Sequence, residues 1–306
     1  MPVKNAIARA WSPKASRDGL RWSIHPGGTR QSPQLDALVF PSNLSGSDQS
    51  APIVALKFTS PHSNGLPFWG DSNAGVTIVR RVWVTQQTGY YAMFWYSDDN
   101  SFEESKTGGK GYYGFHPYPQ SASSAGTTHD WEIASDDGGD FRASDAGPNV
   151  AVTYNRWYKQ AITIQRNGVN SKTIKFYTDL DDVRPETIIT AAVTFASYGE
   201  NNPPQVNPQI TIGDSPWYGT YQHERFSGKL REHIIFSGVV ASQDDCINQG
   251  ALLNGASTTL LSTLAPSIWH GWKGFSSVDD LTCQFGTGRS FSWIDTGNKG
   301  TLGSPV

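Results

Sequence analysis

The stretch that most constrains the fold of this chain is residues 157–242, which holds four short apolar or alternating runs. The runs cover residues 157–164, 174–179, 210–213 and 226–237. Each is rich in β-branched and aromatic residues and is bounded by Asn, Gly, Pro or Asp, as strands separated by turns are. The stretch therefore predicts antiparallel β-structure in the middle of the chain.

Similar runs occur on both sides of this stretch, at residues 52–58, 76–84, 90–96, 112–119, 129–134, 267–273 and 290–294. We expect 76–84 and 90–96 to form an antiparallel pair through the turn at Thr88 and Gly89. Pro117 and Pro119 should end the strand that opens at Tyr112, because proline lacks a ladder donor. Only 244–261 resembles a helix. About a dozen short strands in 306 residues predict two packed antiparallel sheets, a β-sandwich.

The chain divides by composition into three parts. Residues 1–50 are polar, with apolar patches at 20–24 and 35–40, and predict an N-terminal arm that packs on the body through one or two strands. Residues 51–245 form the predicted sandwich, and 246–306 form an extension that packs on it or completes it. Cys246 and Cys283 are either two thiols or one bridge, because sequence separation alone does not decide pairing.

Charge and hydropathy limit the partners that we expect. Charged residues make up 17% of the chain, the net charge is −3, and no Lys/Arg cluster is visible along the sequence, so no nucleic-acid partner is predicted. No run approaches the roughly 18 apolar residues of a membrane span. The first residues lack the apolar segment of a signal peptide, which predicts export by another route, such as release of a virion by lysis.

The central runs also carry a family resemblance. Trp157 precedes an alternating run, an aromatic pair with Asp179 follows, and Ile212-Gly213 precedes a last run with Phe226, Gly228, Leu230, Glu232, Ile235 and Phe236. Together they resemble the concanavalin A-like lectin/glucanase superfamily in its laminin-G-like form, which implies a jelly roll. Leu180 replaces the family's glycine. His233 stands at a usually apolar inward position, which implies either a buried imidazole with partners or a shifted strand register.

The sequence contains partial matches to two kinds of catalytic site. Hydrolases of the superfamily carry Glu-x-Asp-x-x-Glu on one strand, but here Glu132 is followed by Ala134 and Asp137, which we interpret as a strand end entering an acidic turn. A polysaccharide lyase would need a Tyr/His pair and a cation to neutralise a uronate. Tyr113, His116 and Arg225 are the candidates, although no spacing joins them.

Candidate binding residues are aromatic or acidic. Rings expected at the surface, where they could contact sugars, are Trp69, Trp217, Tyr218, Tyr221 and Trp272, whereas Trp83, Trp95, Trp131 and Trp157 are expected in the core. Asp136, Asp137 and Asp140 are the candidates for calcium ligands, although their spacing matches no known calcium loop. The resemblance implies calcium at the rim of some relatives. No other cofactor is expected.

These observations predict a non-catalytic β-sandwich for recognition or assembly. Its expected partners are glycans or neighbouring subunits on a virion or cell surface, as in a phage decoration or tail protein, and it could form homo-oligomers. The alternative is an extracellular polysaccharide lyase or glycoside hydrolase. Fold alone does not decide between them, because this superfold hosts many functions.

Overall fold

The computed structural model of the chain describes residues 36–41, 53–59, 75–87, 94–97, 112–119, 127–136, 150–168, 171–180, 188–194, 209–214, 225–238, 240, 246, 268–286 and 290–304. In this described part, no helix is long and apolar enough to cross a membrane.

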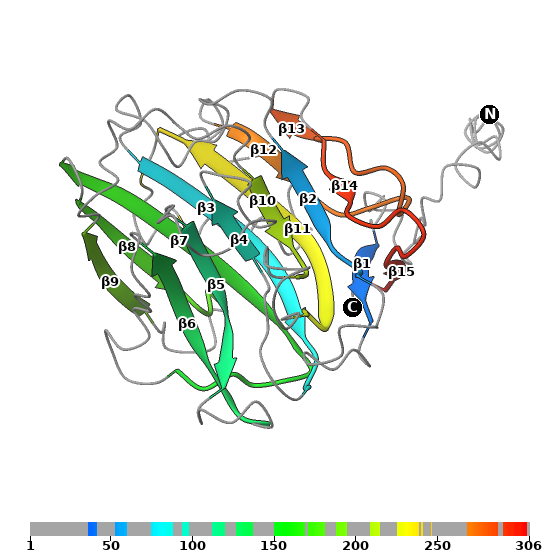
Figure 1. The fold of residues 1–306 in the computed structure, drawn as a ribbon, viewed down its shortest axis with the longest axis horizontal. Helices are drawn as coiled ribbons and strands as arrows, with labels where there is room; N and C mark the ends of the chain where they lie inside the picture. Colours follow the sequence, from blue (N-terminus) through cyan, green and yellow to red (C-terminus); the bar gives the residue numbers. More distant parts are fainter. Residues whose placement is uncertain are drawn as a thin grey trace, which may run out of the picture.

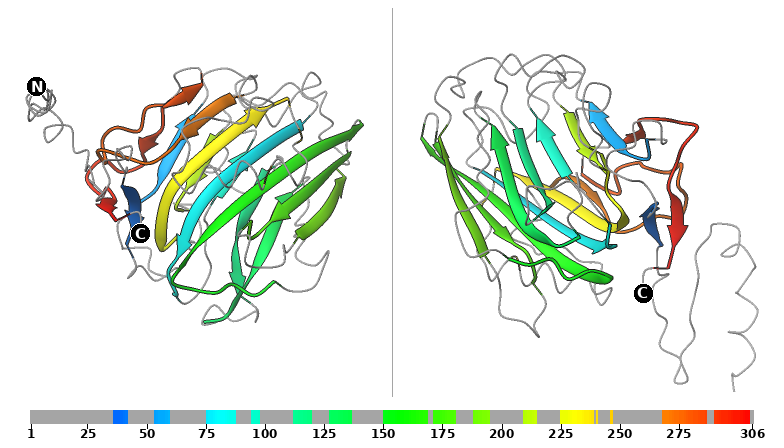
Figure 2. Two further views of the ribbon diagram at one scale, coloured as in Figure 1. Left: turned by 180° about the vertical axis from the view of Figure 1, so that it is seen from behind. Right: turned by 60° about the horizontal axis from the view of Figure 1, so that its bottom comes forward.

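The strands form two antiparallel sheets that lie one over the other (Figures 1 and 2). The nine-stranded sheet has a main path of β13 (Phe285–Gly286), β12 (Ile268–Trp272), β11 (Gly228–Ser237), β3 (Gly75–Val84), β7 (Arg156–Gly168), β8 (Ser171–Tyr177) and β9 (Ile188–Thr194). β1 (Ala37–Phe40) joins it beside β11, and β15 (Thr301–Gly303) beside β1. The six-stranded sheet runs β14 (Ser292–Trp293), β2 (Leu56–Thr59), β10 (Gln209–Ile212), β4 (Phe94–Ser97), β5 (Tyr112–Pro119) and β6 (His129–Asp136). The prediction of a two-sheet antiparallel β-sandwich is confirmed.

The core lies between the sheets and follows the two-residue period of the strands. On β3, Val76, Ile78, Val82 and Val84 belong to the buried cluster, as do Tyr158, Ile162 and Ile164 on β7. From the other sheet, buried apolar side chains include Leu56, Phe58, Phe94, Phe115, Trp131, Ile133, Ile210 and Ile212. Residues at the alternate positions of the nine-stranded sheet therefore lie on its outer face.

The predicted pairing of 76–84 with 90–96 is wrong. β3 pairs with β11 and β7, whereas β4 pairs with β10 and β5 in the other sheet. Two consecutive strands with similar patterns do not reveal whether they share a sheet, because both bury one face in the same core.

Of the two prolines predicted to end β5, Pro117 lies within the strand, whereas Pro119 is its last residue. β5 continues to Pro119, and Pro117 lies opposite Trp131 on β6. The register between β4 and β5 reaches only Gly114, so Pro117 lies beyond the paired part of that side. A proline is tolerated where its missing N–H removes no ladder bond.

Both ends of the described chain contribute to the sandwich. β1 lies within the predicted arm, and the C-terminal strands β12, β13 and β15 extend the nine-stranded sheet while β14 extends the other. Cys246 and Cys283, both in the described part, are not joined by a disulfide. The patch at 20–24 and the predicted helix at 244–261, except Cys246, lie outside the described residues.

His233 combines the two alternatives expected from the sequence, a buried imidazole and a shift in strand register. The register of β11 against β3 shifts between Leu230 and Glu232, so one extra residue is inserted there. Beyond this bulge His233 lies opposite Arg80, is buried, and stacks on Phe94 with ring centroids 5.2 Å apart. Burial lowers the pKa of His233 well below its usual value, with smaller contributions from His270 and Arg80, which favours a neutral ring.

Candidate ligand-binding surface

Most of the aromatic residues predicted to meet a ligand cannot be placed. Trp69, Trp217, Tyr218 and Tyr221 lie outside the described residues. The expected exposure of Trp272 is wrong: its side chain is 0% exposed, packs against Phe291 and His270, and donates from Nε1 to the Thr282 carbonyl at 3.0 Å. Trp272 is part of the core because β12 joins the sheet and turns this position inward.

The residues of the lyase hypothesis occur in separate contacts. His116 lies 3.6 Å from Glu132 across β5 and β6, and both side chains are buried. Arg225 is also buried, 3.7 Å from Asp214. Tyr113 lies in β5, opposite Tyr96 and Ser135, and its side chain is outside the described set.

The calcium candidates stay a prediction. The strand β6 ends at Asp136, whereas Asp137 and Asp140 lie outside the described residues. Across the residues that the structure describes, no group of three or more His, Cys, Asp or Glu side chains is placed to hold a metal ion.

A different cluster occupies the outer face of the nine-stranded sheet, where β11, β3 and β7 run side by side (Figure 2, left). We call it the outer-face patch. It combines two tryptophans with five cationic side chains and one carboxylate: Trp83 and Trp157; Arg81, Lys159, Lys229, Arg231 and Lys273; and Glu232. The tryptophans, Arg81, Lys159, Lys229 and Lys273 are partly exposed, whereas Arg231 and Glu232 are buried.

Strand register brings the tryptophans together. Trp83 lies directly opposite Trp157, and their rings meet edge to face with centroids 5.9 Å apart. Lys229 lies opposite Trp83 on the other side, with its Nζ 5.0 Å from the centre of that ring. The Arg81 guanidinium lies 4.8 Å from the centre of the Trp157 ring. Each ring therefore carries a cation, an arrangement stabilised by the ring's quadrupole.

The carboxylate of Glu232 lies among the cations. Glu232 is opposite Arg81 in the register, and its Oε1 is 3.3 Å from Arg231 Nε. Burial raises the pKa of Glu232 to about 7, although Arg231, Arg81 and Lys273 oppose this by favouring the charged form. The patch therefore gains positive charge as the pH falls through neutrality.

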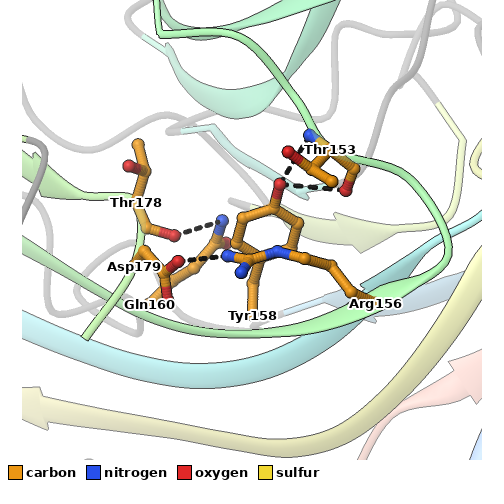
Figure 3. Close-up of polar contacts among 6 residues, drawn as sticks. All are labelled: Thr153, Arg156, Tyr158, Gln160, Thr178 and Asp179. Carbon is orange, nitrogen blue, oxygen red and sulfur yellow. Dashed lines mark hydrogen bonds and ion pairs between the residues drawn. The ribbon is translucent and has the colours of Figure 1, made fainter. Parts of the chain in front are cut away.

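Contacts on the inner face fix the start of β7 and thus the position of Trp157 (Figure 3). Tyr158 Oη accepts from the Thr153 amide at 2.7 Å and donates to the Thr153 carbonyl at 2.9 Å. Arg156 forms an ion pair with Asp179 and lies 3.9 Å above the Tyr158 ring. Since alternate side chains point to opposite faces, anchoring Tyr158 inward holds Trp157 outward.

The placement of Trp83 and Trp157 corrects the prediction that both are core residues, whereas Trp131 is buried as predicted and the side chain of Trp95 lies outside the described set. Strand alternation assigns residues to two faces but does not say which face is covered. The signal that could have found the patch is the alternation of Arg81 and Trp83 with buried valines on β3.

No protein-family model matches the chain, and neither does any curated protein sequence. Among solved structures, a heptameric pentraxin from Limulus polyphemus is similar at 12% identity and a TM-score of 0.41, over 72% of this chain and 84% of that one. A putative carbohydrate-binding protein from Bacteroides ovatus gives 14% identity and 0.39, over 92% and 65%. Domain 4 of an extracellular arabinanase from Geobacillus stearothermophilus, in complex with arabinotriose, gives 13% and 0.34, over 75% and 80%.

Proposed function

We propose that this chain is a non-catalytic carbohydrate-binding β-sandwich whose ligand surface is the outer-face patch. The observation that carries the proposal is the pair Trp83 and Trp157, partly exposed and opposite each other on neighbouring strands. Indole rings present flat apolar surface at a low entropic cost, and they suit the C–H face of a sugar ring.

The rigidity of the surface supports the proposal. The patch lies on β11, β3 and β7, and β3 pairs with the other two along nearly its whole length. A ligand surface on paired strands loses less conformational entropy on binding than one made of loops. Binding energy in such surfaces is concentrated in a few aromatic and arginine side chains, which here are Trp83, Trp157 and Arg81.

The lyase alternative receives less support from the described residues. His116 and Arg225 are buried, and each lies beside a carboxylate. A group that removes a substrate proton must come within hydrogen-bond reach of that substrate. We also propose an extracellular or virion surface as the setting, motivated by the Ser-, Gly- and Asn-rich segments between the predicted strands.

The experiment is a glycan array followed by calorimetry on wild type, Trp83→Ala, Trp157→Ala and Lys175→Ala. Lys175 is an exposed residue of β8 on the same sheet face and is the matched control. Each tryptophan variant should keep the wild-type circular dichroism spectrum and lose affinity about tenfold or more. The proposal would be refuted if the wild type bound no glycan, or if both tryptophan variants bound glycan as tightly as the wild type.

A further inference from the structure

The charge of the outer-face patch is opposite to that of the chain. The whole sequence has a net charge of −3, yet this part of one sheet face carries five cations and one carboxylate among the described residues. The cations come from separate segments: Arg81 from β3, Lys159 from β7, Lys229 and Arg231 from β11, and Lys273 just after β12. Concentrated charge of one sign attracts a ligand of the other.

Resting on the proposed function, we infer that the ligand is an acidic polysaccharide, bearing carboxylate or sulfate groups, that lies across β11, β3 and β7. A neutral glycan would use the two indole rings but would leave the desolvation of the surrounding cations without compensation. An acidic sugar provides both an apolar ring face and an anion for the cation beside it.

The patch continues as a row across the strands. Successive register partners are Thr301, Val39, Lys229, Trp83 and Trp157, on β15, β1, β11, β3 and β7. Neighbouring strands are about 4.8 Å apart, so the row extends for roughly 19 Å. None of these five residues is buried. An extended chain of several sugar units therefore has room to lie along it.

The relation of rings to cations favours a polysaccharide over a nucleic acid. Single-stranded nucleic acids are held by a basic groove along the phosphates and, separately, by rings that stack on the bases. In this patch the two are not separate, because Lys229 lies over Trp83 and Arg81 over Trp157. That arrangement fits a ligand whose apolar face and acidic group belong to the same ring.

Glu232 acts as an internal competitor for the ligand's anion. Among the described residues, the charged groups that act on it are Arg231 on its own strand, Arg81 on β3 and Lys273 after β12. When Glu232 carries a proton, its negative charge no longer offsets these three cations. Binding of an acidic glycan is then stronger at pH 6 than at pH 8, while carboxylates and sulfates of the ligand stay ionised across this range.

Two matched pairs of polymers test the inference by calorimetry at low salt. Polygalacturonate is compared with its fully methyl-esterified form, and dextran sulfate with dextran, so that each pair has the same sugar backbone with and without the acidic charge. Arg81→Gln and Lys229→Gln should each weaken binding of the acidic member about twofold to fivefold, and Lys175→Ala should not. Wild type should bind more tightly at pH 6 than at pH 8, and Glu232→Gln should remove that difference. Poly-glutamate and oligodeoxythymidine test whether an acidic polypeptide or a single-stranded nucleic acid binds as well as the acidic polysaccharides.

The outcomes separate this inference from the proposed function. Preference for polygalacturonate, dextran sulfate or both over the neutral forms, reduced in each of the two glutamine variants, supports it and identifies the acidic group. Equal binding of charged and neutral polymers through Trp83 and Trp157 overturns it and leaves the proposed function standing. Equal or tighter binding of poly-glutamate or oligodeoxythymidine overturns it as well, and no binding of any glycan overturns both.

Discussion

Arg80 donates from Nε to Gln160 Oε1 at 2.8 Å in the space between the two sheets. The same guanidinium donates to the Phe115 carbonyl at 3.2 Å and lies 4.1 Å from the centre of the Phe94 ring. Arg80 thus connects β3 and β7 of one sheet with β5 and β4 of the other. The interior of this sandwich is joined by a buried cation as well as by apolar packing.

Replacing Arg80 should destabilise the fold. Arg80→Ala removes these contacts and leaves a cavity, so we expect a loss of about 3–5 kcal/mol in the free energy of unfolding. Arg80→Met keeps most of the volume and should lose less. Urea denaturation followed by tryptophan fluorescence measures both. A loss below about 1 kcal/mol for Arg80→Ala would show that the contacts do not hold the sheets together.

Glu232 should make stability depend on pH. Its pKa is raised to about 7 in the folded protein because burial disfavours the charged form, against 4.5 as the ordinary value. Between these values the folded state keeps a proton that the unfolded state has released. Stability is therefore greatest below this window and decreases as the pH rises through it, by about 3 kcal/mol in total.

Urea denaturation at pH 5 and pH 8 checks this dependence. Glu232→Gln should reduce the difference between the two pH values, because the amide does not titrate. Asp279→Asn, at an exposed acid, is the control and should leave the difference as in wild type. A Glu232→Gln variant with the full wild-type difference would assign the pH dependence to other groups.

Alanine substitutions at Gly213 and Gly238 distinguish the cost of backbone strain from the cost of steric overlap with a neighbouring side chain. Both have positive φ, at 105° and 78°, in the region that side chains rarely adopt. A Cβ at Gly213 would lie 2.7 Å from Cε1 of Phe40, whereas one at Gly238 meets no described atom within 4 Å. We expect Gly238→Ala to cost about 1 kcal/mol and Gly213→Ala about 2–3 kcal/mol. Chemical denaturation compares them, and equal losses would contradict the packing of Phe40 on Gly213.

Replacing Trp272 should mainly lower stability, whereas replacing Trp157 should mainly lower glycan affinity. Trp272 packs in the core against Phe291, with ring centroids 4.6 Å apart, so Trp272→Ala should lower stability by about 3–5 kcal/mol. Trp157→Ala should lower glycan affinity while costing less than half as much stability. Thermal melts and calorimetry on the two variants measure this. Equal destabilisation would mean that Trp157 is a structural residue.

Much of the strand content could be predicted from the sequence. The runs at 76–84, 129–134 and 226–237 correspond to β3, β6 and β11, since period-2 alternation in a buried strand is set locally. The pairing of 76–84 with 90–96 and the continuation of β5 through Pro117 were not predicted correctly. Both depend on which strand lies alongside, and that is a long-range property.

The candidate surface could be predicted less well from the sequence than the strands. Trp83 and Trp157 were expected in the core and Trp272 at the surface, and the structure reverses both. All three occur in strands with similar patterns. Their exposure depends on whether another layer covers the face to which they point, and residues distant along the chain decide that.

By itself the sequence determined that this chain forms short antiparallel strands around one apolar interior, because alternation and turn residues act over a few positions. Only the tertiary structure decided that Lys229, Trp83 and Trp157, scattered over nearly 150 residues, stand in one row. Register and the β11 bulge are fixed by pairing between remote segments. The cationic aromatic patch is therefore a product of the assembled sheet rather than of any local motif.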